Sequence, residues 1–341
     1  MASEQHDDRM FLRFAESFSA ACHPRYLLLT GGEPLIRPRL TARLAEAARA
    51  VGTRTYALTG MYFARGGGDI PAPVRQALRS VDHVAASIDA FHEEEVSRRD
   101  VFRVVHRLLD VGTDVSFQVV GTGDDDPYLA EVTSAIRREF GDRVPMLVGA
   151  VRPHGRAKSL PLHREDNRQD HGEAHTARRT GRHAHEPLPC TIAAWPVVGP
   201  DGTVTACGNQ AVVDHVPLPE HLRLGHVTVD DWPAIRARCL GAPLVRALRL
   251  VGPRSLHRRY GSTEPGSSYC QTCWRLGDDA TALAAAEVLA ARATTTIVEA
   301  YVEALQRERG AVGFARRYGC AAYAELVLLG HDEPKAAACS A

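Results

Sequence analysis

The chain has 341 residues, and its 41 Lys and Arg balance its 41 Asp and Glu, so the formal net charge is zero. This balance gives no support for a nucleic-acid partner or an anionic membrane, and no apolar run reaches the length that spans a bilayer. The composition is that of an ordinary soluble globular protein. Residues 1–8 are polar and acidic, unlike a secretory signal, so we expect a cytoplasmic protein whose eight cysteines are ligands or thiols rather than disulfides.

Apolar periodicity over the first 150 residues predicts strands and helices that alternate. The expected strands are 26–30, 55–59, 83–88, 115–120 and 144–148. The expected helices are 8–21, 38–51, 71–80, 98–110 and 127–140. Alternation at this spacing is typical of βαβ units, so we expect an α/β fold with a parallel sheet that curls towards a barrel.

Small and polar residues gather at the carboxyl ends of three predicted strands. They are Gly31, Gly32, Glu33 and Pro34 after the first strand, Thr59 at the end of the second, and Ser87 and Asp89 at the end of the third. The carboxyl ends of parallel strands share one edge, where α/β folds bind their ligands. We therefore expect a ligand site at this edge. The alternatives are a tight turn without a ligand at 31–34 and a simple helix cap at Asp89.

The composition changes after the predicted sheet. Residues 161–186 are polar and rich in histidine without a fixed spacing, so we interpret 159–189 as a surface loop or linker rather than a metal site. A different module follows, in which Gly199-Pro200-Asp201-Gly202 indicates a hairpin between 192–198 and 203–206. We expect four segments: the sheet over 8–158, the loop over 159–189, a cysteine-bearing domain over 190–275 and a helical tail over 276–332.

Four cysteines have the spacing of ligands to a shared inorganic centre. They are Cys190, Cys207, Cys270 and Cys273. Two of them lie on either side of the predicted hairpin, and the Cys-x-x-Cys turn brings in the other two from far along the chain. Structural zinc, a 4Fe–4S cluster and a redox disulfide all fit, and spacing alone favours zinc. The other four cysteines lack partners at ligand spacing, so we expect buried or incidental thiols there.

At this point the chain resembles the radical S-adenosylmethionine (SAM) superfamily. The resemblance lies in three motifs in order, LTGGEPL at 29–35, LTG at 58–60 and SIDAFH at 87–92. The four cysteines resemble the twitch type of SPASM domain, which holds one auxiliary 4Fe–4S cluster. The resemblance covers residues 8 to 275 and implies a partial (βα)6 TIM-like barrel followed by a small auxiliary-cluster domain.

The resemblance also implies roles for these residues. Gly31 to Pro34 would bind the methionine amino group of SAM, because an ammonium group prefers exposed carbonyls and a carboxylate. Ser87 and Asp89 would face the ribose or carboxylate of SAM, and Thr59 would lie beside it. Members of the family reduce SAM through a first 4Fe–4S cluster, and the resulting deoxyadenosyl radical abstracts hydrogen from a substrate.

The chain departs from the family upstream of the first motif. The first cluster is normally held by Cys-x3-Cys-x2-Cys after the first barrel strand, and only Cys22 precedes LTGGEPL here. We therefore expect the first strand and its three cysteines to be absent. Since a cluster open at one iron needs three thiolates, we expect no reductive cleavage of SAM by this chain. Either the true start lies upstream, which we favour, or the chain is a degenerate member.

These observations lead to one main expectation about function. We expect a radical SAM-type iron–sulfur protein, an oxidoreductase or a peptide- or small-metabolite-modifying protein, with a partner enzyme or a reductant protein as its protein partner. The resemblance implies that the auxiliary cluster accepts an electron during an oxidation. The alternative is a non-catalytic scaffold, stabilised by zinc or iron–sulfur, that binds a peptide or a partner enzyme. A weaker third alternative is a SAM-binding regulator. No catalytic residue is assigned, although His92 and Gln118 lie near the expected site.

Overall fold

The computed structural model describes residues 7–151, 188–213 and 217–331, so the predicted histidine-rich loop lies outside the described residues except for its last two positions. The described chain forms two compact units. Residues 24–151 and 311–331 form one, which we call the sheet unit. Residues 7–23 and the described residues from 188 to 310 form the other, which we call the cysteine unit.

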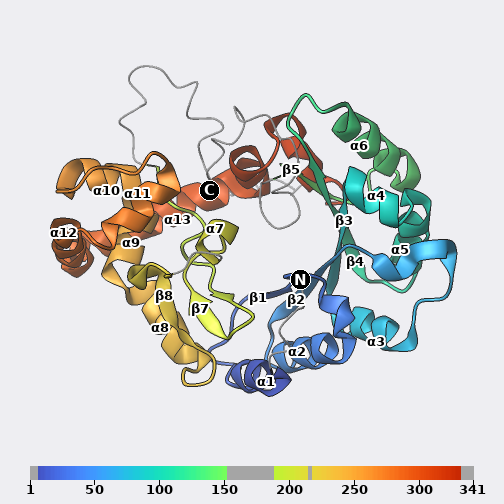
Figure 1. The fold of residues 1–341 in the computed structure, drawn as a ribbon, viewed down its shortest axis with the longest axis horizontal. Helices are drawn as coiled ribbons and strands as arrows, with labels where there is room; N and C mark the ends of the chain where they lie inside the picture. The colour runs from blue at the N-terminus through green and yellow to red at the C-terminus, as the bar shows by residue number, and fades with distance from the viewer. Residues whose placement is uncertain (1–6, 152–187, 214–216, 332–341) are drawn as a thin grey trace, which may run out of the picture. The chain divides into compact units, whose positions relative to one another are not determined.

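The sheet unit is built on five parallel strands in the order β1-β2-β3-β4-β5, which curl into a half-barrel (Figure 1). The strands are β1 (Tyr26–Leu29), β2 (Arg54–Thr59), β3 (His83–Ile88), β4 (Asp114–Gly121) and β5 (Met146–Ala150). Buried and partly exposed side chains alternate along β2, β3 and β4, so one face of the sheet is packed and the inner face is open to a greater degree. This confirms the predicted α/β fold with a curled parallel sheet.

Helices cover the outer, convex face of this sheet (Figure 1). They are α2 (Pro38–Ala50), α3 (Ala72–Ser80), α5 (Arg98–Asp110) and α6 (Pro127–Phe140). Three short helices, η1 (Pro34–Ile36), η2 (Tyr62–Gly67) and α4 (Ala90–Glu95), follow the ends of β1, β2 and β3. Between the longer helices and the sheet, the rings of Phe102, Phe117 and Phe140 pack with centroids 5.2 to 5.8 Å apart. This core fixes α5 and α6 against β4.

The last strand of the half-barrel does not begin where the sequence predicts. The apolar run suggests 144–148, but β5 is Met146–Ala150. Val144 is 1% exposed and contributes to the core before the strand starts. Pro145 has no N–H for a ladder, and its carbonyl accepts a hydrogen bond from Phe117 N. The apolar character of Val144 therefore reflects core packing rather than strand pairing.

The chain after Ala311 returns to the sheet unit and packs on β5. The segment η7 (Ala321–Leu328) follows Cys320, whose backbone N–H donates to Val148 O at 2.8 Å. Gly319 lies so close to this strand that a Cβ there would stand 2.3 Å from Val148 O. Covering the outer edge of a terminal strand protects it from other chains. The division therefore differs from the expected tail over 276–332, because residues from 311 onwards contribute to the sheet unit.

The cysteine unit combines a three-stranded antiparallel sheet with helices. The short elements are α1 (Asp8–Glu16), β6 (Val197–Val198), β7 (Thr203–Thr205), α7 (Gln210–Val213), η6 (Glu220–Leu222) and β8 (Arg223–His226). The longer segment has α8 (Trp232–Gly241), α9 (Pro243–Val251), α10 (Pro253–Tyr260), α11 (Tyr269–Leu276), α12 (Ala280–Ala291) and α13 (Ala293–Tyr318). The predicted hairpin is confirmed at its turn, since β6 and β7 pair across Gly202, whose φ of 91° is left-handed, but the first strand covers only Val197–Val198 rather than 192–198.

The first helix is shorter than predicted and belongs to the cysteine unit. It ends at Glu16 rather than near Ala21, because the Ser17 hydroxyl donates to Phe14 O and the chain then turns at Ser19 and Cys22. Ser17 Oγ also accepts from Trp232 N at 2.8 Å, and the Phe18 ring lies 5.6 Å from that of Trp232. These contacts attach α1 to α8, whereas the sequence-based division placed residues 8–158 together.

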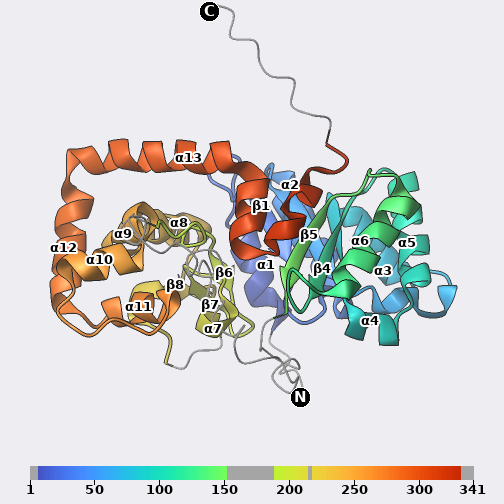
Figure 2. The same ribbon diagram turned by 90° about the horizontal axis from the view of Figure 1, so that it is seen from above.

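The helices α12 and α13 meet at a bend of 88° (Figure 2). Gly310 breaks α13 with φ of 55°, and the boundary between the two units falls at this residue. Within the described ranges, no helix taken singly has both the length and the apolar composition to cross a bilayer, although this bent pair passes the same test of length and composition when taken together.

Candidate functional site

The carboxylate of Glu33 joins the ends of β1 and β2. Its Oε1 accepts from Leu35 N at 3.0 Å, and its Oε2 accepts from Thr59 Oγ1 at 2.9 Å and from Gly60 N at 2.8 Å. Thr59 is 1% exposed, so its hydroxyl is a buried partner of the carboxylate. The structure thus brings together the predicted site residues that follow the first two strands.

The backbone at Gly31 and Gly32 is left-handed, with φ of 82° and 56°. A Cβ at either position would meet nothing within 4 Å, so glycine is needed for the backbone conformation rather than for space. Pro34 then begins η1, and its carbonyl accepts from Thr41 Oγ1 at 2.8 Å. These residues turn the chain sharply out of β1 and place Glu33 over the end of β2.

Asp89 caps α4 and also contacts a histidine. Its Oδ1 accepts from Phe91 N at 2.9 Å and from His92 N at 2.8 Å, as the helix-cap alternative anticipated. Its Oδ2 lies 2.6 Å from His92 Nδ1. Burial alone would raise the pKa of Asp89, but the hydrogen bonds from His92 and Phe91 outweigh burial and lower the pKa. Asp89 is therefore ionised at neutral pH, both as a cap and as the partner of an imidazole.

Gly60 links the Glu33 and Asp89 groups. A Cβ built on Gly60 would lie 3.0 Å from His92 Nε2 and 3.7 Å from Glu33 Oε2. The imidazole and the carboxylate therefore flank the same position above the end of β2. Polar groups that follow β1, β2 and β3 thus lie at one shared edge of the sheet. We call this set the rim, namely Gly31, Gly32, Glu33, Pro34, Thr59, Gly60, Asp89 and His92.

Ser87 lies beside the rim, on the partly exposed inner face of the sheet. Ala86 pairs in register with Thr59, so Ser87 is level with Gly60, and it pairs in turn with Gln118 of β4. Among the described contacts, the connection between Glu33 and Asp89 runs through Gly60 and His92 rather than through Ser87. Ser87 and Gln118 are therefore residues of the inner wall next to the rim.

The residue after Gly60 has an unusual backbone. Met61 is fully buried and has φ of 59°, a left-handed conformation that non-glycine residues rarely adopt. Its N–H donates to Thr59 Oγ1 at 3.0 Å, and the adjacent Tyr62 hydroxyl donates to Leu35 O at 2.9 Å. Burial and the nearby Glu33 raise the pKa of Tyr62. Backbone strain of this kind clusters at ligand sites, where the surrounding contacts maintain it.

An ion-pair network holds α4 in place. Arg98 donates from Nε and Nη2 to the two oxygens of Glu93, and its Nη1 donates to Glu131 at 2.6 Å. The Tyr128 hydroxyl donates to Glu93 Oε1 at 2.9 Å. Burial, and then the Glu93 charge, raises the pKa of Tyr128. Because Glu93 lies one turn from Asp89, this network fixes the position of the Asp89–His92 pair.

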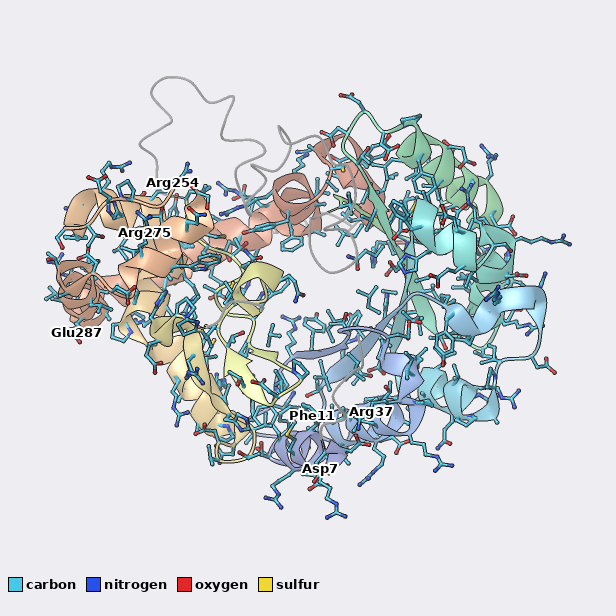
Figure 3. All side chains as sticks on the ribbon, viewed as in Figure 1. Asp7, Phe11, Arg37, Arg254, Arg275 and Glu287 are labelled. Carbon is cyan, nitrogen blue, oxygen red and sulfur yellow. The ribbon has the colours of Figure 1, made fainter. Side chains whose placement is uncertain are left out.

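The cysteine unit contains the second candidate site, which we call the four-cysteine set. Its members are Cys190, Cys207, Cys270 and Cys273. Cys190 N donates to Leu248 O at 3.0 Å, which holds this cysteine against α9. Cys207 follows β7, and the other two lie in α11, whose N-cap is Ser268. Arg275 of α11 donates to the carbonyls of Glu264 and Pro265 and so anchors the loop before the helix (Figure 3).

The four thiol groups interact with one another. Burial is the main cause that raises the pKa of Cys273 well above its usual value, and repulsion from the other three members of the set adds to it. Burial also raises the pKa of Cys207 to about 12, although the N–H of Asn209 opposes this effect. Buried thiols that repel one another as thiolates are stabilised in that form by a shared cation. No disulfide joins any of the seven described cysteines.

Two residues beside the set were not predicted from the sequence. Asn209 is 3% exposed and donates to two sulfurs, from N to Cys207 Sγ and from Nδ2 to Cys270 Sγ, both at 3.4 Å. His221 Nε2 lies 3.8 Å from Cys273 Sγ. In the sequence, Asn209 is marked only by its position two residues after the predicted ligand Cys207. His221 is not marked, because its distance along the chain from the four cysteines matches no metal-ligand motif.

The His221 side chain is buried in its neutral form. Burial lowers the pKa of His221 to about 4, and Asp278 opposes this only in part. Its Nδ1 is buried and makes no hydrogen bond within the described part of the chain. A buried polar atom without a partner is uncommon in folded proteins. The unpartnered nitrogen of His221 therefore lies beside the thiol of Cys273 in a buried part of the unit.

The four-cysteine set does not have the geometry of a single-ion site. Across residues 7–151, 188–213 and 217–331, no three or more His, Cys, Asp or Glu side chains are arranged to hold one metal ion. The thiols are neighbours in electrostatic terms, since the other three each raise the pKa of Cys273.

Comparison with known proteins gives no family for this chain. No family model matches it, and no curated protein matches it. Function has to be inferred from the geometry of the rim and of the four-cysteine set.

Proposed function

We propose that this chain is a radical SAM-type iron–sulfur protein, in which the four-cysteine set holds an auxiliary 4Fe–4S cluster and the rim binds SAM. Its function is that of a cytoplasmic oxidoreductase or of a modifying protein for a peptide or a small polar metabolite, together with a reductant protein, although we expect no reductive cleavage of SAM by the 341-residue polypeptide itself. In this proposal the sheet unit corresponds to part of a (βα)6 barrel, and residues 190–275 correspond to the auxiliary-cluster domain.

The observation that carries this proposal is the juxtaposition of sulfurs from distant segments, since Asn209 donates to both Cys207 Sγ and Cys270 Sγ at 3.4 Å. All three other members of the set raise the pKa of Cys273, although they come from two loops and one helix. Buried thiols are costly to ionise unless a positive centre binds them. A cluster here supplies or accepts one electron, and the N–H donors at its sulfurs adjust how readily it does so.

The rim has the donor and acceptor groups for the amino end of SAM. The Glu33 carboxylate offers about four acceptor sites, and the described donors use three of them, so one remains for an ammonium group. Glu33 and the ionised Asp89 make the rim negative, which favours a cationic ligand. The left-handed Gly31 and Gly32 keep the approach to Glu33 free of side chains.

Metal and sulfide analysis of the chain purified without oxygen tests this function. We expect iron and acid-labile sulfide in equal amounts, and loss of both in Cys270→Ala and Cys273→Ala. Cys239→Ala is the matched control, because Cys239 is 2% exposed in the same unit but lies in α8 outside the set. Iron retained in both variants would contradict the assignment of ligands.

The non-catalytic scaffold is the second candidate function. It is supported by the spacing of the cysteines in the sequence, because the Cys270-x-x-Cys273 turn together with Cys190 and Cys207 also suits structural zinc. In that case zinc or a stable cluster holds the unit, and the partner is a peptide or an enzyme. Stoichiometric zinc without iron in the same anaerobic preparation would favour this candidate.

A further inference from the structure

Asn209 contacts two parts of the four-cysteine set, one through its backbone and one through its side chain. Its backbone N–H points to the sulfur of Cys207, two residues earlier, and its side-chain Nδ2 points to the sulfur of Cys270 in α11. The residue is 3% exposed, so water does not replace these partners. One residue therefore donates to sulfurs that come from two distant segments of the chain.

The hydrogen bonds from Asn209 indicate the charge of the sulfurs that accept them. A neutral thiol is a weak hydrogen-bond acceptor. Burying an amide group whose only acceptor is weak costs folding free energy. A thiolate that binds metal carries negative charge and makes a charge-assisted hydrogen bond of roughly twice the strength. The buried Asn209 amide thus fits sulfurs that are anionic in the working protein.

The hydrogen bonds of Asn209 act differently on the two redox states of a bound centre. Reduction adds one electron from a low-potential reductant, breaks no bond, and makes the sulfurs more negative. N–H dipoles that point at these sulfurs stabilise the reduced state more than the oxidised state. Removing the side-chain donor therefore makes the centre harder to reduce.

We propose that Asn209 is a positioning residue that sets the reduction potential of the centre held by the four-cysteine set. This inference rests on the proposed function, because it requires an iron–sulfur centre at these thiols. It assigns to Asn209 a role in the electron step and none in contact with a substrate.

A redox titration of the full chain, monitored by electron paramagnetic resonance, tests this role with dithionite as the reductant. We compare the wild type with Asn209→Leu, which keeps the volume but has no donor, and with Asn209→Ala, which adds no bulk. Thr205→Val is the matched control, because Thr205 is 5% exposed and its hydroxyl donates to Cys207 O rather than to sulfur.

We expect both Asn209 variants to keep their iron. At a fixed potential, the ratio of reduced to oxidised centre should fall about tenfold, which for one electron is a shift of the reduction potential by about 59 mV to lower values. Thr205→Val keeps the wild-type potential. Wild-type potentials in both Asn209 variants would overturn the inference and leave the proposed function intact. Loss of iron from both variants would also overturn the inference, since Asn209 would then be needed to hold the centre rather than to set its reduction potential. A wild type without iron would instead overturn the proposed function.

Discussion

Asp89 and His92 are joined by a contact of 2.6 Å between Oδ2 and Nδ1 at the start of α4. The other oxygen of Asp89 accepts two backbone N–H groups, so the carboxylate is fixed and in turn orients the imidazole ring. The Nε2 atom of His92 then faces the position above Gly60 that Glu33 also faces. Polar groups that follow three strands are thereby connected in the rim, and the predictions for Glu33 and Gly60 depend on this arrangement.

Glu33→Gln is expected to weaken SAM binding. The substitution removes the charge that pairs with the amino group, and a hydrogen bond to a charged group contributes about 1.5 to 3 kcal/mol, which corresponds to roughly 10- to 100-fold in Kd. Isothermal titration calorimetry with SAM measures this. Glu139→Gln is the control, because Glu139 pairs with His106 on the helices away from the rim. Equal affinity of wild type and Glu33→Gln would remove Glu33 from the binding site.

Gly60→Ala is expected to disturb the rim through one methyl group. The new Cβ would lie 3.0 Å from His92 Nε2, so the imidazole must move away from its position beside Glu33. Overpacking of this kind costs about 1 to 3 kcal/mol, so we expect SAM affinity to fall by about tenfold. Gly123→Ala is the matched control, since a Cβ there meets nothing within 4 Å. If the two variants bind SAM alike, His92 and Gly60 do not border the ligand.

Asp279→Asn is expected to destabilise the cysteine unit. Asp279 is 1% exposed and accepts hydrogen bonds from the backbone and hydroxyl groups of Ser262 and Thr263 and from two N–H groups of α12. The variant loses part of these hydrogen bonds, which should lower the free energy of unfolding by about 1 to 3 kcal/mol at pH 7. Urea unfolding followed by tryptophan fluorescence reports on this unit, because Trp195, Trp232 and Trp274 all lie in it.

The same residue predicts a pH dependence. Burial alone would raise the pKa of Asp279, but its hydrogen bonds hold the pKa well below the usual range. Since the folded pKa lies below the unfolded value of about 3.9, the stabilisation is complete above about pH 4 and is lost as the pH falls towards the folded pKa. The variant should lose less stability than the wild type below pH 4. Asp231→Asn is the control, because Asn is an equally good N-cap and should change little.

The 341-residue polypeptide is expected to form no 5′-deoxyadenosine when it is incubated with SAM and dithionite without oxygen. An open cluster needs three thiolates, and only Cys22 precedes the LTGGEPL motif in this sequence. Liquid chromatography of the reaction mixture measures the product. Its formation by the purified polypeptide, above a control without protein, would show that a SAM-cleaving centre is held by other residues.

The sheet and its rim could be predicted because both follow from local patterns. Apolar runs that end in glycine or polar residues mark the strands, and parallel pairing places their carboxyl ends together. Glu33 and Asp89 are therefore neighbours in the structure, as the order of their strands implies. The helix that begins at Pro127 and the one over Arg98–Asp110 also have the predicted bounds, because N-caps and turn glycines mark them.

The remaining features depend on contacts between distant residues, which single-sequence patterns do not show. The membership of α1 in the cysteine unit rests on Phe18 packing against Trp232. The packing of η7 on β5 combines the hydrogen bond from Cys320 N to Val148 O with the packing of Tyr323 and Leu326 against the core of the sheet unit. Asn209 approaches the thiols through the turn after β7, and no ligand spacing marks a residue that donates to sulfur rather than binding metal.

X-ray absorption at the iron and zinc edges of the anaerobically purified chain tests the central claim most directly. The account predicts an iron edge with sulfur neighbours and a second shell of iron at short distance, because each thiolate of the four-cysteine set binds a different iron atom. A zinc edge with sulfur neighbours at about 2.3 Å and no iron signal would contradict it, since one ion would then gather all four thiols.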